Sequence, residues 1–228
     1  MSIRLQLFLG LFLIQGLVLQ GHASAQTAPS LSEEAAYRGL HAAALNGDSD
    51  LIRRLVERGA NLEARDSYGR TPLHVAAYKS HEDALAVLVA AGGDINAYEH
   101  DAYDVVTIAA VADDVEMLRR AISLGGNAKN ITSPYDGTAL IAAAHLGHVE
   151  VVKTLINAGA PLDHINNLGW TALIEAVVLG DGGPNHVETA RALINAGADI
   201  SIGDRGGVTP LRHARRRGYK NIVALFIK

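Results

Sequence analysis

Small and apolar residues recur along the chain with a period of about 33 residues. Each period opens with a short alanine-rich run, such as residues 71–77 (Thr-Pro-Leu-His-Val-Ala-Ala). A second run follows with Leu, Val or Ile at positions i, i+3 and i+4, as at Leu85, Leu88 and Val89. This spacing places the apolar side chains on one face of a helix. The pattern therefore predicts two short helices in every period, separated by polar loops.

The alanine-rich run is found six times, and a second signature keeps register with it. The run begins at residues 38, 71, 104, 138, 171 and 209. A glycine follows the second run at Gly59, Gly92, Gly125, Gly159 and Gly197, where it can form a left-handed helix cap. One such unit cannot bury its apolar face alone, so the units are expected to stack.

This combination of signatures resembles the ankyrin repeat, and the resemblance covers roughly residues 35–228. It implies an all-α fold, a solenoid of stacked helix-turn-helix units joined by β-hairpin-like loops. The expected units are residues 35–67, 68–100, 101–134, 135–167, 168–205 and 206–228. His41 and His74 fall at the position where the family uses a structural histidine to tie the loop to its neighbour.

Residues 1–25 are predicted to be a cleavable signal peptide. Arg4 precedes an apolar stretch over residues 5–19, and residues 23–25 (Ala-Ser-Ala) match a signal-peptidase site. The stretch is shorter than the roughly 20 apolar residues of a spanning helix. Retention as a membrane anchor remains the alternative. Residues 26–34 are expected to form a lead-in, with residues 32–34 (Ser-Glu-Glu) resembling a helix cap.

The composition narrows the classes of function. The chain has no cysteine, which excludes disulfides and thiol catalysis. Its formal net charge is −4, which argues against nucleic-acid binding. Residues 204–228 depart from this average with seven Lys and Arg against one Asp. They form either a solvated end cap or an electrostatic patch for an acidic partner.

Two units depart from the pattern. The third unit lacks Thr-Pro-Leu-His and contains four aspartates, Asp101, Asp104, Asp113 and Asp114. The fifth unit is five residues longer, and the extra length is assigned to the turn at residues 179–186. Insertions in solenoids often map to loops on the binding face. We expect this turn to protrude.

The sequence evidence for catalysis is weaker than the evidence for protein binding. Paired carboxylates can perform acid–base chemistry, but the four aspartates are expected at solvated loops and turns. Gly180, Gly182 and Gly183 lack the Lys-Ser/Thr of a phosphate-binding loop. No pair of histidines has zinc-ligand spacing. We therefore expect no enzyme activity, no cofactor and no metal.

The binding face is predicted from the aromatic residues. Most tyrosines and the single tryptophan fall on loop positions or at the ends of the first helices, where the resemblance places partner contacts. Tyr and Trp also dominate binding hot spots. The predicted partner-contacting residues are Tyr68, Arg70, Tyr78, Lys79, Tyr103, Tyr135, His145, Trp170 and Leu179.

The sequence thus favours a monomeric module that binds another protein, of unknown identity, in the periplasm or outside the cell. It resembles exported bacterial ankyrin-repeat proteins, a group with links to oxidative-stress defence and to inhibition of a cell-wall enzyme. This resemblance implies an adaptor, stabiliser or inhibitor of another exported protein, without membrane attachment after signal cleavage. The alternatives are a small-ligand protein, a hydrolase that uses the acidic cluster of the third unit, or a homo-oligomer.

Overall fold

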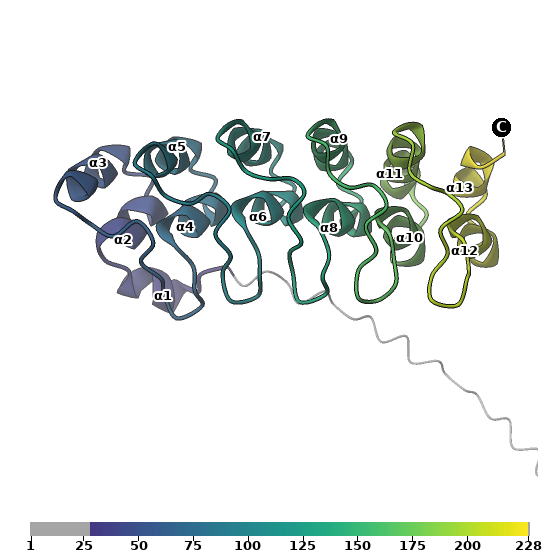
Figure 1. Cartoon of the computed structure of the whole chain (residues 1–228), viewed down its shortest axis with the longest axis horizontal. Coiled ribbons are helices and arrows are strands. Elements are labelled where there is room, and N and C mark those ends of the chain that lie inside the picture. The colour runs from purple at the N-terminus through teal and green to yellow at the C-terminus, as the bar shows by residue number, and fades with distance from the viewer. Residues whose placement is uncertain (1–27, 228) are drawn as a thin grey trace, which may run out of the picture.

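The computed structural model describes residues 28–227, which form two rows of helices and one row of loops (Figure 1). We call the row beside the loops the inner helices and the other row the outer helices. The predicted signal peptide lies outside the described residues. Between residues 28 and 227, no helix combines the length and the apolar character needed to cross a membrane.

Each of the six predicted units contains one inner and one outer helix. The inner helices are α2 (Gly39–Leu45), α4 (Pro72–Tyr78), α6 (Val105–Val111), α8 (Ala139–Leu146), α10 (Ala172–Val178) and α12 (Pro210–Arg217). The outer helices are α3 (Ser49–Glu57), α5 (Glu82–Ala90), α7 (Val115–Ser123), α9 (Val149–Asn157), α11 (Pro184–Asn195) and α13 (Lys220–Leu225). The all-α solenoid predicted from the periodicity is confirmed.

Five of the six inner helices follow directly on the threonine or aspartate of the repeat signature, whereas α2 follows Arg38. Thr138 and Thr171 accept the backbone N–H three residues later at 3.3 Å, which satisfies an otherwise free donor of the first turn. Asp104 does the same in the third unit at 2.8 Å. The aspartate therefore replaces the lost threonine without loss of the cap.

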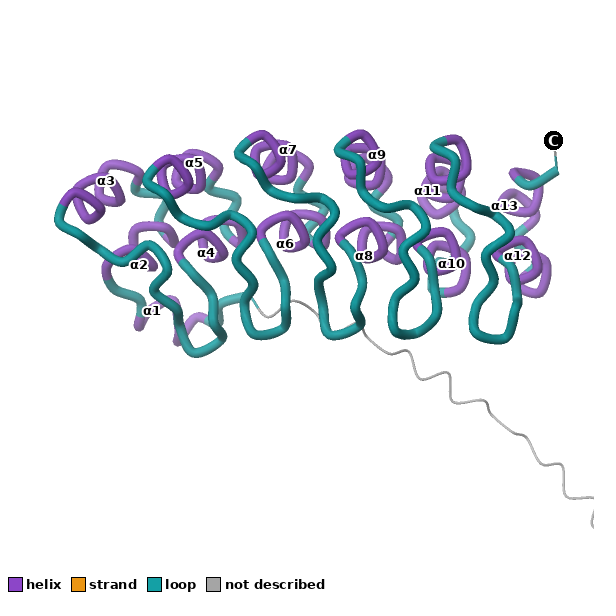
Figure 2. Tube along the Cα trace, viewed as in Figure 1, coloured by secondary structure: helices purple, strands orange, loops and turns teal. Residues whose placement is uncertain are grey.

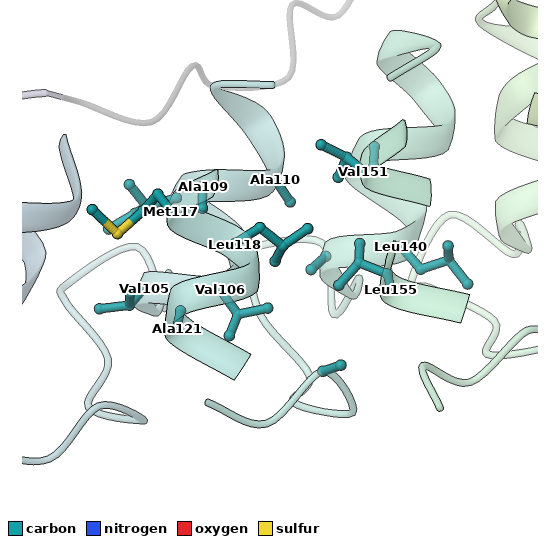
Figure 3. Close-up of a cluster of buried hydrophobic side chains, with 14 of the residues drawn as sticks. Val105, Val106, Ala109, Ala110, Met117, Leu118, Ala121, Leu140, Val151 and Leu155 are labelled. Carbon is teal, nitrogen blue, oxygen red and sulfur yellow. The ribbon is translucent and has the colours of Figure 1, made fainter. Parts of the chain in front are cut away.

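The core lies between neighbouring units. Figure 3 shows Met117 and Leu118 of the third unit and Leu140 and Val151 of the fourth among the side chains that fill it. The paired alanines of the inner helices are fully buried, and their small size lets adjacent helices approach closely. Stability therefore comes from contacts between neighbours, as expected for a solenoid.

The loops are tight turns with little strand character (Figure 2). The one isolated β-bridge among the described residues joins Thr132 and Gly137. Neighbouring loops are linked along the solenoid, since the N–H of Asn167 donates to the carbonyl of Tyr135 at 2.9 Å. The N–H of His100 likewise donates to Tyr68 at 3.0 Å. These bonds hold the loops in one continuous row.

An additional helix, α1 (Leu31–Ala36), precedes the first unit on the loop side (Figure 1). The predicted cap at residues 32–34 is shifted by two residues, because Ser30 is the capping residue and forms a capping box with Glu33. Glu34 pairs with Lys79 of the second unit at 2.5 Å. The lead-in thus packs against the solenoid through its charged residues.

Only part of the extra length of the fifth unit lies in the turn at residues 179–186. Outer helix α11 has 12 residues, whereas α9 has nine, so part of the insertion extends this helix. The remaining turn is held in place, because the hydroxyl of Tyr219 donates to the carbonyl of Gly180 at 2.9 Å. His186 also bonds Asp181 at 2.8 Å. The turn is therefore part of the contact between units five and six.

Two basic residues of the last unit, Arg212 and Arg215, occupy positions that are buried in other units. Arg215 corresponds in register to the fully buried Ala144 and Val177 of the preceding units, yet its side chain is exposed. Arg212 is exposed in the same way. Charges at these positions keep the outer face of the last described unit polar, as a terminal repeat requires. The placement favours the end-cap interpretation of this segment.

Candidate protein-interaction face

Large apolar side chains project from the loops into solvent. They belong to successive loops and remain between 40% and 53% exposed. We call them the tip stripe: Tyr68, Tyr98, Ile131, Ile165 and Leu168. Single exposed apolar residues are ordinary on a protein surface, but a row of them marks an interaction site.

The ends of the inner helices provide a second set of accessible residues. Leu146 of α8 and Leu179 after α10 are 42% and 40% exposed. Tyr78 and His145, at equivalent positions of α4 and α8, are half-buried. Together with the tip stripe they form what we call the loop-side face. Of the predicted contact residues, Tyr68 and Leu179 are exposed on it, and Tyr78 and His145 are half-buried.

Three other predicted contact residues are only partly accessible. Tyr135 and Trp170 are half-buried in their loops. The side chain of Lys79 is 35% exposed and is engaged by Glu34 of α1. Helix α1 therefore covers part of the inner-helix surface at the second unit. The most accessible part of the loop-side face lies over the third, fourth and fifth units.

Two predicted contact residues are buried, and this part of the prediction is wrong. Tyr103 is 5% exposed, and burial, with the nearby carboxylates of Asp101 and Glu99, raises its pKa to about 12. Arg70 has no exposed surface. Both residues directly precede an inner helix, where the chain turns inward against the neighbouring unit. They hold the loops and cannot contact a partner directly.

Arg70 is the centre of a buried ionic cluster. Its Nε donates to Asp66 at 2.6 Å, and its Nη2 donates to Glu33 of α1. Its guanidinium also stacks over the ring of Tyr68 at 4.7 Å. Burial would raise the pKa of Asp66, but hydrogen bonds from Tyr37 and Arg70 outweigh it and hold that pKa below its ordinary value. The cluster joins α1 to the loop between α3 and α4.

A buried carboxyl that the sequence did not single out lies between the fourth and fifth units. Glu175 of α10 accepts a hydrogen bond from Nδ2 of Asn166 at 2.8 Å, and its side chain is 4% exposed. Its second oxygen, Oε2, is buried without a hydrogen-bond partner. Nδ1 of His145 is 3.7 Å from Oε2, too far for a hydrogen bond.

The electrostatics of this pair follow from its burial. Desolvation raises the pKa of Glu175 to about 7, although the hydrogen bond from Asn166 acts in the opposite direction. Desolvation, assisted by the nearby His186, lowers the pKa of His145. Both shifts favour the uncharged forms. The only sequence signal for this site is a Glu at a position of the inner helix that is apolar or alanine in units one to four.

Two of the four aspartates proposed as an acidic cluster, Asp104 and Asp114, serve as caps of different helices. Asp104 begins α6 and also accepts hydrogen bonds from Thr107 and Asn130. Asp114 begins α7, where it accepts the N–H of Met117 at 2.9 Å and the hydroxyl of Ser80 at 2.5 Å. The two caps lie at opposite ends of α6. This arrangement gives no support to a hydrolase that uses these residues.

Capping predicts how Asp114 responds to substitution. Asp114→Ala is expected to lower the free energy of unfolding by about 1 kcal/mol, because the first turn of α7 loses its acceptor. Asp114→Asn retains an acceptor and should retain most of the stability. Asp113→Asn, at the neighbouring residue in left-handed conformation (φ 56°), is the control and should have little effect. Urea denaturation measures all three, and equal losses in both Asp114 variants would contradict capping.

The histidines act as ties between units, as predicted for His41 and His74. Nε2 of His41 bonds the carbonyl of Arg70 at 2.9 Å, and Nε2 of His74 bonds that of Tyr103 at 3.3 Å. His148 and His186 bond carbonyls at the ends of the preceding inner helices, at 3.0 Å and 2.9 Å. The role of His186 was not predicted, because the insertion hid its equivalence to His148.

Comparison with known proteins gives one consistent family. The family described as "Ankyrin repeats (3 copies)" matches residues 12–99 and 106–204. YahD of Escherichia coli (strain K12), an ankyrin repeat protein by its description, is 31% identical over 186 residues, which is 81% of this chain and 92% of YahD.

Solved structures agree. An ankyrin repeat domain from Acinetobacter baumannii AYE superposes with a TM-score of 0.77 at 42% identity, over 82% of this chain and 95% of that domain. The ankyrin repeat protein EF0377 superposes with a TM-score of 0.75 at 29% identity, over 84% of this chain and 98% of that one. The match extends over at least 92% of the length of each of these relatives.

Proposed function

The chain belongs to the ankyrin-repeat family, and on that basis we propose that it is an exported module that binds one protein of the cell envelope. Ankyrin repeats are protein–protein interaction modules and in general are not catalytic. We propose that it acts as an adaptor, stabiliser or inhibitor of that protein, in the periplasm or outside the cell. The proposed location rests on the apolar segment and the cleavage motif of residues 1–25.

The tip stripe is the observation that carries the binding role. Ile165 and Leu168 are 51% and 41% exposed on one loop, and Ile131 of the preceding loop is 53% exposed. None of these side chains contributes to the buried core of the described residues. When a partner covers aliphatic side chains that a rigid loop holds in water, their burial contributes favourably to the free energy of binding. Their arrangement in a row fits an extended protein surface better than a small ligand.

A matched pair of isoleucine substitutions tests this proposal. Ile165→Asp places a charge on the tip stripe, whereas Ile200→Asp places one on an equally accessible isoleucine (43% exposed) in the loop that leaves α11. The full chain is used as bait in an envelope extract of the source organism. We expect Ile165→Asp to lose the captured protein at least tenfold, since a buried charge costs several kcal/mol. Ile200→Asp should retain it.

The two variants also separate loss of binding from loss of fold. Both residues are exposed, so both variants should melt within a few degrees of the unsubstituted chain. Retention of the captured protein by Ile165→Asp would exclude the tip stripe as the binding surface. Equal loss in both variants would show that capture depends on non-specific apolar contact.

A further inference from the structure

Glu175 is the strongest unexplained feature of the loop-side face. Its carboxyl is almost completely buried, yet one of its two oxygens has no hydrogen-bond partner. A buried acceptor without a donor destabilises the fold, and more strongly when it is charged. The fold of the fifth unit does not need this group, because the equivalent positions of units two and three are Val75 and Ile108. One oxygen of Glu175 holds Asn166, but Oε2 has no use within the fold, and a costly unsatisfied atom suggests a site for a ligand.

The missing donor can come from the loop-side face. Nδ1 of His145 is 3.7 Å from Oε2, and its side chain is 24% exposed, so the imidazole lies beside the carboxyl and also reaches solvent. It sits at the C-terminal end of α8, and its side-chain nitrogens form no hydrogen bond among the described contacts. Rotamer changes of this kind are common when interfaces form. Displacement of one imidazole therefore opens Oε2 to a partner.

The surroundings define the kind of group that fits. Leu146 and Leu179, at the ends of α8 and α10, are exposed apolar side chains on the same face. An apolar stem with a charged donor at its end satisfies both features, since lysine and arginine pack their stems on apolar surface and place the charge beyond it. Among the described residues, no lysine or arginine forms an ion pair with Glu175.

We propose that Glu175 is the recognition carboxylate for a lysine or arginine side chain of the bound protein, with His145 as its movable cover. The partner is then a protein that presents a basic residue within an apolar segment. This inference rests on the proposed interaction function and specifies the chemistry of the partner at units four and five.

Other titratable groups near the site are already paired. From the start of α11, His186 faces the end of α8 and is bonded to Asp181 at 2.8 Å. From α12, His213 is paired with Asp204 at 2.8 Å. His145 is the remaining titratable group beside Glu175, and its burial lowers its pKa, which favours the neutral imidazole. As the pH rises from 6 to 8, the charge of the site therefore changes mainly at Glu175.

Binding of a basic group should consequently depend on pH. The cation interacts with the carboxylate form, and the pKa of Glu175 in the folded, unbound chain is about 7. Raising the pH from 6 to 8 converts the carboxyl from mostly protonated to mostly ionised. The dissociation constant of a basic peptide should fall by roughly tenfold over this range.

The test is a selection of peptides from a random displayed library on the full chain. The unsubstituted chain, Ile165→Asp, Glu175→Gln and the exposed-residue control Glu150→Gln are used in parallel. We expect the unsubstituted chain and Glu150→Gln to enrich peptides with one fixed Lys or Arg between apolar residues. Glu175→Gln should lose this enrichment, and a synthesised basic peptide should bind it at least tenfold more weakly at pH 8.

The outcomes distinguish this inference from the proposed function. Peptides that bind the unsubstituted chain and fail on Ile165→Asp, but show no basic preference or bind Glu175→Gln equally well, would overturn the inference alone. Selection of no peptide that depends on Ile165 would count against both. Thermal melting of Glu175→Gln confirms that it is folded, which is expected because the substitution removes a buried ionisable group.

Discussion

Replacement of Arg70 by methionine is expected to lower the free energy of unfolding by about 3–5 kcal/mol, because Arg70 is completely buried. The substitution leaves Asp66, whose side chain is 9% exposed, and Glu33 without their counterion. Removal of one member of a buried ion pair costs more than the pair itself contributes, because the remaining charge stays desolvated. The loss should be largest in the first two units.

Urea denaturation and amide hydrogen exchange measure this effect. Arg65→Met is the matched control, since Arg65 is exposed in the same loop and should cost less than 1 kcal/mol. Arg70→Met combined with Asp66→Asn should recover part of the stability, because one unpaired charge is removed. A loss in Arg70→Met no larger than that in Arg65→Met would show that the cluster does not hold the loop.

Glu175→Gln is expected to stabilise the chain by about 3 kcal/mol at pH 8 and by almost nothing at pH 4. Glutamine keeps the acceptor for Asn166 and places an N–H₂ group toward the uncharged Nδ1 of His145. The pKa of Glu175 is about 7 in the fold, against 4.5 ordinarily. Each unit of pKa difference corresponds to about 1.4 kcal/mol.

The sign follows from the two states of the carboxyl. Below pH 4.5 both the folded and the unfolded chain hold the proton, so Glu175 brings no penalty. Between pH 4.5 and 7 only the unfolded chain loses the proton, which favours unfolding progressively. Above pH 7 the penalty is constant. Stability of the unsubstituted chain should therefore decline over this window relative to Glu175→Gln.

Denaturation curves at pH 4, 6 and 8 test the prediction. Glu150→Gln, at an exposed glutamate paired with Lys153, is the control and should show no comparable gain with pH. Parallel stability profiles for Glu175→Gln and the unsubstituted chain would mean that Glu175 ionises normally in the fold. Together with the peptide selection, a stability gain accompanied by loss of basic peptides would identify Glu175 as a group that favours binding at the expense of stability.

The helical organisation could be predicted because it depends on short-range patterns. Thr138 and Thr171 cap helices that begin at the next residue, and the glycines such as Gly159 follow the outer helices. These features need only a few consecutive residues. The fifth unit was less predictable, since nothing local indicates that Pro184 begins an extended outer helix rather than a loop.

The interaction face was predicted only in part. Aromatic residues were chosen as contacts, but Tyr103 is buried while the aliphatic Ile131, Ile165 and Leu168 are exposed. An isoleucine in a loop normally indicates burial, and its exposure depends on how the next unit stacks. A register argument could have identified Ile165, since it aligns with the exposed Tyr98 two units earlier.

The sequence by itself determined the repeat, the helix pairs and the all-α solenoid, because each of these follows from periodicity and capping within about 33 residues. Only the tertiary structure decided which residues face a partner and which titratable groups meet. Arg70 pairs with Glu33 of α1, and Glu175 of α10 lies 3.7 Å from His145 of α8. Such contacts join side chains 30 or more residues apart in the chain, and their burial and pKa values exist only after neighbouring units have packed together.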